Sequence, residues 1–515
     1  MTDQQRWDYL GVMGHPTLET PALDALAAKG VTFKYSYCQS PICGASRMCT
    51  YTGRYMTTHG GHWNNIPLNV AEHTIGDYLR PLGVRTALIG KTHMAADVAG
   101  MAKLGIDRHS ELGVLLSECG FEPYERDDGL HPSESADPNL PYNAWLRAHG
   151  YAGDNPWHDW ANSAEGPNGE ILSGWQMRHS PLPARVDKDH SETAYMTKRA
   201  MTFIEEAGDQ PWCAHLSYIK PHWPYIAPAP YHALYSANQI QPANRTRAER
   251  DRPHPVHAAF MAHEDSTSFA RDDVRRAVIP AYMGLIREID DWLGTLFAFM
   301  EKRGLMDDTM IVFTSDHGDY LGDHWLGEKE LLHEESVRVP LIVYDPDSRA
   351  DATRGAIDER LTESVDLAAT FFDVYGGVDD GQRLEGRSLL PLIRDGGHAP
   401  DWREHVISET DFAMRDAAKR LGLKPNEARG YMIASRQWKY ILWEKQPPQL
   451  FDLAADPEEQ HDRAGEGLPV ERELHDRLFA HFRGRRTRTT ISDKALAQRA
   501  GKAVQVKRGF RIGEW

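Results

Sequence analysis

The chain has 515 residues, of which 41% are hydrophobic and 26% are charged, and its formal net charge is -17. This length and composition predict a globular protein with one large and one small domain. The acidic balance argues against nonspecific binding to nucleic acid, although a locally positive pocket can still hold an anionic substrate.

The five cysteines are sparse: Cys38, Cys43, Cys49, Cys119 and Cys213. An odd count without a CxxC pair argues against a disulfide scaffold or a thiolate zinc site and favours a reducing compartment. The polar start, MTDQQRWDYLG, lacks the apolar stretch of a signal peptide, and no apolar run is long enough to cross a bilayer. We therefore expect a cytoplasmic protein that does not enter a membrane.

Short apolar runs that end in polar or glycine residues predict buried strands. These runs are residues 84–90, 212–219, 310–315, 339–344 and 405–410. Helical patterns lie between them, and this alternation predicts an α/β fold with a mainly parallel sheet covered by helices on both faces.

Three helical patterns have recognisable ends. Asp189, with Glu192 three residues later, predicts a capping box in front of residues 194–208. Pro280 is expected to open a helix with one apolar face, because proline suits a first turn. Residues 364–377 predict a helix closed by glycine.

Two stretches with little periodicity, residues 120–188 and 227–268, are expected to be long loops in which substrate specificity resides. After about residue 377 the pattern changes to short strands and turns. We therefore divide the chain into a catalytic α/β domain (1–377), a smaller antiparallel-sheet domain (378–482) and a basic tail (483–515).

Polar side chains follow three of the predicted strands. Lys91 and His93 follow the first run, and Asp316-His317 follows the third. Ligands of open α/β sheets lie beyond the carboxyl ends of strands, so these residues are candidates for one site. A carboxylate beside an imidazole is a frequent pair of metal ligands, with a polar turn as the alternative reading.

His222, after the second run, is a candidate general acid or else a packing partner of Trp223. Cys43 opens the sequence Cys-Gly-Ala-Ser-Arg, which ends at Arg47. A lone cysteine is most often inert and buried, but a nearby arginine is not what a core thiol needs. Asp3-Gln4, at the start of the chain, does not indicate a function by itself.

Together these segments resemble the sulfatase family of the alkaline-phosphatase superfamily, including its arylsulfatases and phosphonate monoester hydrolases. The resemblance covers most of the chain and follows the family's order of motifs: residues 20–55, GKTH, PHWP, TSDHGDYLGDHWLGEKELLHEESVRVPLIVY and WKYILWE with QLFDLAADPEE. It implies an alkaline-phosphatase-like large mixed sheet sandwiched by helices, with a smaller C-terminal α+β domain containing an antiparallel sheet.

The resemblance implies that a formylglycine-generating enzyme oxidises Cys43 to formylglycine. One hydroxyl of the aldehyde hydrate attacks sulfur or phosphorus to give a covalent ester. Deprotonation of the other hydroxyl then expels the anion and regenerates the aldehyde. The implied activity is metal-dependent hydrolysis of sulfate monoesters, or of phosphonate or phosphate monoesters, as small anionic substrates.

The resemblance also implies roles for single residues. One divalent ion, Ca²⁺ or Mn²⁺ with Mg²⁺ as a further candidate, is expected at Asp3, Gln4, Cys43, Asp316 and His317. Arg47 is expected to steady the formylglycine hydroxyl. Lys91, His93 and Lys329 are expected to bind the transferred group's oxygens, and His222 or His93 to protonate the leaving oxygen. Asn64 is a weaker candidate for a polar contact.

The sequence departs from the family pattern at three places. Ala45 replaces a common proline, and Gln4 replaces an aspartate common among sulfatases. Asp-Gln is similar to the phosphonate branch, whereas Lys91 and His93 are more similar to sulfatases, so the substrate preference stays open. Only two residues precede Asp3, where family members have an apolar strand, and we expect the natural start to lie upstream.

Two alternatives stay open: a phosphodiesterase of the same superfamily with an unmodified nucleophile, or a catalytically silent binding protein if Cys43 remains a thiol. The tail is a solvated terminus, or it docks on the body or a neighbouring subunit through Phe510, Ile512 and Trp515. We expect a homo-oligomer. Trp157, Trp160, Trp175 and Trp223 hint at an aromatic pocket or, equally, at packing residues.

Overall fold

The computed structural model describes residues 1–129, 140–379, 381–500, 506–507 and 510–511. Its large sheet has two hydrogen-bonded parts. One part contains, in spatial order, β10 (Ala356–Glu363), β1 (Val31–Tyr37), β9 (Leu341–Tyr344) and β7 (Ile311–Thr314), with β8 (Arg338–Val339) also paired to β1. The other part contains β3 (Glu122–Arg126), β2 (Arg85–Gly90) and β6 (Trp212–Ser217).

The first residues of the chain join these two parts. The Thr2 amide donates to the Thr314 carbonyl at 2.9 Å, and the Tyr218 amide donates to the Met1 carbonyl at 2.9 Å. Thr2 forms a parallel bridge with Ser315 and Asp3 forms one with Pro221. We call residues 1–3 the seam. Because Asp3 belongs to the seam, its side chain lies where β6 and β7 end.

Strand directions confirm a mixed, mainly parallel sheet. The pairs β1–β10, β2–β3 and β2–β6 are parallel, whereas β9 runs antiparallel to both β1 and β7. Four of the predicted apolar runs form β2, β6, β7 and β9, and the fifth forms β11 (Val406–Asp411).

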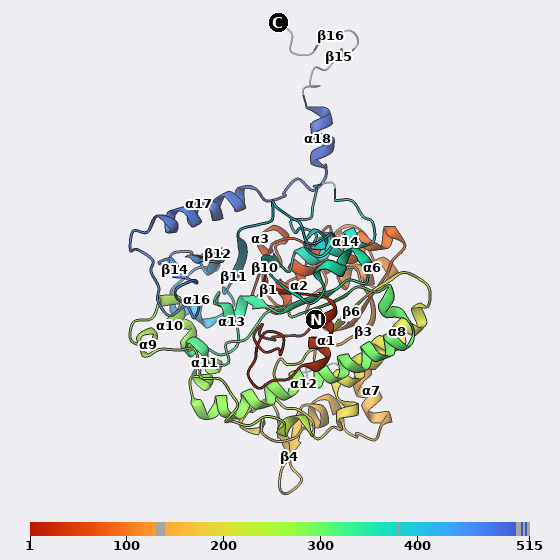
Figure 1. Cartoon of the computed structure of the whole chain (residues 1–515), viewed down its shortest axis with the longest axis vertical. Helices are drawn as coiled ribbons and strands as arrows, with labels where there is room; N and C mark the ends of the chain where they lie inside the picture. Colours follow the sequence, from red (N-terminus) through yellow and green to blue (C-terminus); the bar gives the residue numbers. More distant parts are fainter. Residues whose placement is uncertain (130–139, 380, 501–505, 508–509, 512–515) are drawn as a thin grey trace.

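The sheet is covered on both faces because successive side chains of a strand point to opposite sides. In β2, Ala87 and Ile89 pack in one buried cluster with α8 (Glu192–Ala207), α12 (Asp272–Lys302) and α1 (Pro21–Lys29). Leu88, between them, packs in another with α2 (Cys43–Thr52), α4 (Ile75–Leu79) and α14 (Asp366–Val374). These two helical layers are visible on either side of the sheet (Figure 1).

The smaller sheet is antiparallel, in the order β11, β12 (Arg429–Ala434), β13 (Trp438–Trp443) and β14 (Gln449–Asp452). On one face Ile433 and Leu450 pack against Leu474 and Leu478 of α17 (Pro469–Arg483). On the other face Met432 and Phe451 pack with the loop that precedes α13 (Glu334–Val337). This contact places the small sheet beside the segment that carries Lys329.

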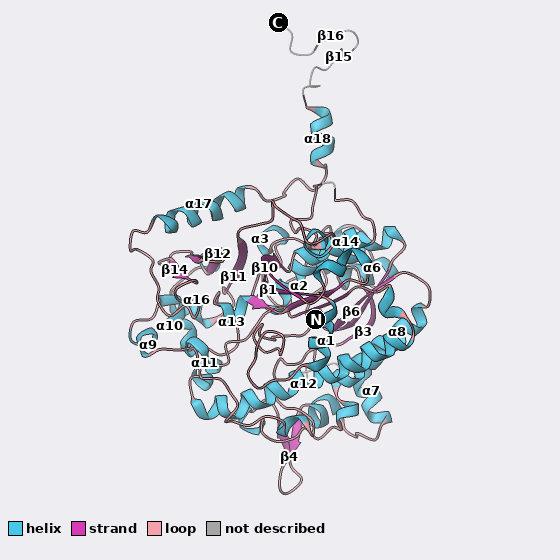
Figure 2. Ribbon diagram, in the orientation of Figure 1, coloured by secondary structure: helices cyan, strands magenta, loops and turns pink. Residues whose placement is uncertain are grey.

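The remaining helices are short and peripheral (Figure 2). They are α3 (Met56–His59), α5 (Val98–Lys103), α6 (Glu111–Ser117), α7 (Pro141–Ala148), α9 (Arg247–Asp251), α10 (Pro255–Met261), α11 (Glu264–Phe269), α15 (Leu390–Ile393), α16 (Asp416–Arg420) and α18 (Asp493–Arg499). Two small hairpins pair β4 (Ser163–Glu165) with β5 (Ile171–Ser173) and β15 (Val506–Lys507) with β16 (Phe510–Arg511). Within the described residues, every helix is too short or too polar to span a bilayer.

Three expectations from the sequence were wrong. Pro280 lies inside α12, which begins eight residues earlier at Asp272, so the proline occupies a helix interior. Ser191, not Asp189, caps α8, because its hydroxyl accepts the Ala194 amide at 3.2 Å. Neither predicted long loop is a single loop: residues 120–188 contain β3, α7, β4 and β5, and residues 227–268 contain α9, α10 and most of α11, all of which are too short to show periodicity. The glycine-closed helix is confirmed as α14.

The tail leaves the body in Figure 1, where α18 points away from the rest of the chain. Before it, Arg485 forms a buried ion pair with Glu409, and the Arg486 amide donates to Glu385 at 3.0 Å. Ile512 and Trp515, which were expected to dock the tail, lie outside the described residues, and Phe510 is described by its backbone alone.

Candidate active site

Arg47 forms the electrostatic centre of the site. Its Nε lies 2.9 Å from Asp316 Oδ2, and its Nη2 lies 2.9 Å from Asp3 Oδ2. Nη1 donates to the Lys91 carbonyl at 2.9 Å and to Ser217 Oγ at 2.7 Å. All three charged side chains are 0% exposed. The planar guanidinium thus spans two carboxylates that arrive from the seam and from the end of β7.

Cys43 is the first residue of α2 and faces this pair of carboxylates. Its Sγ lies 3.1 Å from His317 Nε2 and 3.9 Å from Asp3 Oδ1. The helix is anchored here because Ser46 Oγ donates to the Asp316 carbonyl at 2.5 Å. The Gly44 amide donates to Asn64 Oδ1 at 2.8 Å, so Asn64 supports the helix N-terminus. The side chain of residue 43 therefore shares one buried centre with Asp316 and His317.

The pKa shifts show that cations dominate the field at residue 43. Burial raises the pKa of the Cys43 thiol, but Lys329, Lys91 and His317 outweigh it and bring the pKa well below its ordinary value. Burial and Cys43 likewise raise the pKa of Asp3, but Lys91 is foremost among the cations that hold it below its usual range. An anionic group at position 43 is thus stabilised.

His317 is held as a metal ligand would be. Its Nδ1 is 2.9 Å from the Gly318 carbonyl, which accepts only, so Nδ1 carries the proton and Nε2 faces Cys43. Burial lowers the pKa of His317, yet Asp316 and Cys43 raise it to about 9. A positive charge is therefore favoured at this point despite complete burial.

The donor set fits a divalent cation. Ligand atoms of Asp3, Cys43, Asp316 and His317 all lie within 4.8 Å of one another, and all four residues are buried. Two carboxylates and an imidazole are donors for Ca²⁺, Mn²⁺ or Mg²⁺. Gln4, the fifth predicted ligand, adjoins them through its backbone amide, which donates to Asp316 Oδ1 at 3.0 Å.

Two lysines border this donor set. Lys91 Nζ is 2.7 Å from Asp3 Oδ2, and Lys329 Nζ donates to Gln4 Oε1 at 2.7 Å. Burial lowers the pKa of Lys329, but Cys43 and Glu328 raise it above its usual value. Both ammonium groups are thus charged and lie beside the predicted nucleophile, where an oxyanion needs stabilisation.

The two histidines that were candidates for the general acid differ. His222 Nε2 is 3.9 Å from Asp3 Oδ1, and its Nδ1 is 2.7 Å from the Trp223 carbonyl. Burial, with Lys329, lowers the pKa of His222 to about 3. His93 has a left-handed backbone (φ 55°), its amide donates to Asp128 at 2.9 Å, and its buried Nδ1 has no hydrogen-bond partner among the described residues. His222 therefore contacts the centre directly, whereas His93 is tied to the loop after β3.

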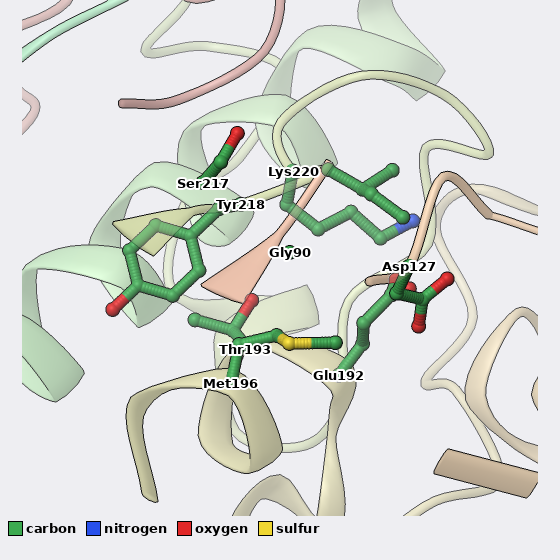
Figure 3. A pocket seen from close by; sticks show the side chains of 9 residues that line it. Gly90, Asp127, Glu192, Thr193, Met196, Ser217, Tyr218 and Lys220 are labelled. Atoms are coloured by element: carbon green, nitrogen blue, oxygen red, sulfur yellow. The ribbon is translucent and has the colours of Figure 1, made fainter. Parts of the chain in front are cut away.

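A buried charged cluster lies beside Gly90, where Asp127, Glu192 and Lys220 converge (Figure 3). Lys220 Nζ donates to Asn162 Oδ1 at 2.7 Å and to the Pro224 carbonyl at 2.8 Å. Burial lowers the pKa of Lys220 to about 8 and raises that of Glu288 to about 7. The cluster connects the ends of β3 and β6 with the start of α8, and nothing in the sequence motifs marked it.

Some supporting residues were missed at the level of sequence, notably Ser217, Asp319 and Tyr225. Each contacts a site residue across more than 90 positions of the chain, and short motifs hold no signal for such pairs. The tryptophans are resolved towards packing: Trp157 is buried, and Trp160 and Trp175 pack against the same core cluster. Trp223 packs edge-on against Trp175, with 4.6 Å between ring centroids.

Comparison with known proteins agrees with this geometry. The family model described as Sulfatase matches residues 1–378. The chain belongs to the sulfatase family. A second model, described as N-sulphoglucosamine sulphohydrolase, C-terminal, matches residues 322–483 of this sulfatase.

The relatives are similar along nearly their whole length. A multifunctional alkaline phosphatase superfamily protein of Trinickia caryophylli is 32% identical, with 90% of each chain covered. An arylsulfatase of Clostridium perfringens is 26% identical, over 89% of this chain and 88% of the relative. The structure of a phosphonate monoester hydrolase of Agrobacterium radiobacter is similar with a TM-score of 0.80 and 27% identity, covering 100% of this chain and 98% of that one. The predicted alkaline-phosphatase-like fold is thereby confirmed.

Proposed function

We propose that this sulfatase hydrolyses sulfate monoesters and phosphonate or phosphate monoesters, with a nucleophile derived from Cys43. The observation that carries the proposal is the position of Cys43 Sγ, 3.1 Å from His317 and inside a buried set of metal donors. Relatives named arylsulfatase and phosphonate monoester hydrolase support both ester classes. Maturation by a formylglycine-generating enzyme is part of the proposal.

Formylglycine at position 43 supplies an oxygen nucleophile with a second hydroxyl for release, and a divalent ion held by Asp3, Gln4, Asp316 and His317 supplies Lewis acidity. Arg47 favours the ionised forms of Asp3 and Asp316, because its guanidinium contacts both carboxylates, whereas burial and Asp3 raise the pKa of Asp316 above its ordinary value. Lys91 and Lys329 bind the peripheral oxygens of the ester, whose negative charge they offset.

His222 is assigned the proton transfer at the site. The Trp223 carbonyl accepts from Nδ1, so in the neutral ring Nε2 holds a lone pair and faces the centre. In this state His222 accepts a proton from a hydroxyl at position 43, and the protonated ring then donates to the leaving oxygen. His93 is assigned oxygen binding rather than proton transfer, since His222 is the histidine whose ring reaches Asp3, with 3.9 Å between Nε2 and Oδ1.

The test combines mass spectrometry with a substrate panel. The protein is expressed with and without a formylglycine-generating enzyme, and the peptide containing residue 43 is weighed. Aryl sulfates, choline sulfate and phosphonate monoesters are then assayed with added Mn²⁺ or Ca²⁺. We expect turnover to follow the aldehyde content and to vanish in Cys43→Ala. Full activity of a protein with an unmodified thiol, or no turnover by converted and metal-loaded protein, would overturn the proposal.

A further inference from the structure

Gln4 is held by an unusually complete set of contacts. The residue is 0% exposed and has a left-handed backbone with φ 65°. Its carbonyl oxygen accepts from Tyr282 OH at 2.8 Å, and its side-chain Oε1 accepts from Lys329 Nζ at 2.7 Å. Its side-chain Nε2 donates to Asp319 Oδ2 at 2.6 Å and to Tyr225 OH at 3.2 Å. Backbone and carboxamide are therefore both fixed.

The chemistry of the neighbours determines which end of the carboxamide faces which side. An ammonium group only donates, so Lys329 must face the oxygen of Gln4. The Oδ2 atom of Asp319 already accepts the Tyr225 hydroxyl, so it faces the nitrogen of Gln4, which can also donate to it. Reversing the amide would bring the nitrogen against Lys329 and the oxygen against Asp319, with both groups buried. One orientation is therefore strongly preferred.

Asp319 is itself anchored, so it defines the position of the amide rather than following it. Its Oδ1 accepts the Leu321 amide at 2.9 Å, and its Oδ2 also accepts from Tyr225 OH at 2.7 Å. Both side chains are almost completely buried, Asp319 at 0% and Tyr225 at 1% exposure. Gln4, Asp319 and Tyr225 form a closed hydrogen-bonded triangle that we call the amide clamp.

We propose that Asp319 and Tyr225 are positioning residues that orient the Gln4 carboxamide towards the candidate metal donors and make a carboxylate at position 4 unfavourable. The inference rests on the proposed metal site. With its nitrogen engaged by the clamp, Gln4 keeps one lone pair of Oε1 for a cation while Lys329 occupies the other. The metal donors then carry one negative charge fewer than a site with aspartate at this position.

A carboxylate at position 4 is unfavourable because the position is buried. A carboxylate at position 4 would lie at contact distance from the Asp319 carboxylate, with no donor hydrogen between them. The hydrogen bond that the Gln4 nitrogen now donates to Asp319 Oδ2 would be lost inside a buried site, and that loss is costly. The clamp thus explains why the first pair of metal ligands is Asp-Gln in a chain that has Asp at position 319.

The test measures Mn²⁺ binding by calorimetry, independently of turnover. It uses the variants Q4E and D319N and the double variant Q4E/D319N. We expect each single variant to weaken Mn²⁺ binding about 10–100-fold, as loss of an outer partner of a ligand does. In the double variant a carboxamide at position 319 can donate to the new carboxylate, so binding should return to within about tenfold of the wild type. Additive losses in the double variant would overturn the proposal.

Two tyrosines provide a matched pair of variants in which Asp319 itself is not substituted. Tyr225→Phe removes a hydroxyl that contacts the Gln4 carboxamide, whereas Tyr282→Phe removes one that contacts only backbone groups of Gln4 and Arg6. We expect the first change to weaken Mn²⁺ binding more than the second, because the second leaves the hydrogen bonds of the carboxamide itself in place. Equal effects would contradict the clamp. A wild type that binds Mn²⁺ but hydrolyses no ester would reject the proposed function and leave the clamp intact.

Discussion

Arg47 and Asp316 form an ion pair that is buried on every side, with 2.9 Å between Nε and Oδ2 and 0% exposure of both side chains. The pair joins α2 to the end of β7, and the same guanidinium reaches Asp3 in the seam. Folding and the candidate chemistry therefore depend on a single side chain.

Removing this guanidinium should be costly. In Arg47→Met the Asp3 and Asp316 carboxylates lose a shared partner, and we expect the free energy of unfolding to fall by about 3–5 kcal/mol, with activity lost. Arg47→Lys should recover only part of this, because one ammonium cannot span both carboxylates. Urea unfolding followed by fluorescence measures the free energy of unfolding of both variants. Arg472→Met, at a side chain that is 89% exposed, is the control and should change little; an equally mild effect at position 47 would contradict the prediction.

The donor set predicts stabilisation by metal. Mn²⁺ at a hundredfold excess over its Kd should stabilise chelator-treated protein by about 2.7 kcal/mol, seen as a higher Tm. Asp316→Asn should abolish most of this rise, because it removes the charge of one donor in the buried set. Asp273→Asn, at an exposed pair with Arg271, should keep it. If Asp316→Asn responds to Mn²⁺ as the wild type does, the ion binds elsewhere.

Glu288 predicts a pH dependence of stability. Burial raises its pKa from 4.5 to about 7, so its ionisation is resisted in the folded protein. Stability is therefore full below the unfolded pKa and falls as the pH rises from about 4.5 to about 7, by up to about 3 kcal/mol. Glu288→Gln should remove this loss while Lys220 keeps its two neutral acceptors.

The measurement is Tm at pH 5 and pH 8. The gain from Glu288→Gln should be clearly larger at pH 8 than at pH 5. Glu301→Gln, on the same helix but with a side chain that is 72% exposed, should show no such difference. A gain that is the same at both pH values would mean that the ionisation of Glu288 is not the cause.

Gly90 tests how closely β2 and β6 approach beside Lys91. It has φ +112°, and a Cβ there would lie 1.9 Å from the Ser217 carbonyl oxygen. Gly90→Ala should destabilise the protein by several kcal/mol, roughly the sum of strain and overpacking, and lower activity by moving Lys91. Gly83→Ala has φ +80° with nothing within 4 Å, so it should show strain alone, about 1–2 kcal/mol. Similar Tm losses in the two variants would contradict the close approach.

Sequence patterns predicted the parts of this molecule that depend on local order. Apolar runs located β2, β6, β7, β9 and β11, because burial on both faces requires such runs. Pro280 misled because packing of the 31-residue α12 outweighs the loss of one backbone hydrogen bond. The Asp189 capping box misled because Ser191 competes for the same end of α8.

The candidate site likewise contains residues that local sequence patterns indicated and residues that they did not. Asp316-His317, Lys91 and His222 were found because each follows a strand, and Cys43, Arg47 and Lys329 because their motifs resemble a family. Asp319 and Tyr225 were not found, since their contacts with Gln4 join residues 315 and 221 positions apart. Such pairings depend on strand order, which no local pattern specifies.

The seam has a mechanical consequence. Residues 1–3 close the sheet between β6 and β7, and Asp3 is also one of the metal donors. Any force or solvent that parts those two strands must pull a ligand out of the centre in the same motion. Loss of cation affinity and loss of sheet structure should thus occur as one event, and their denaturation curves should superimpose.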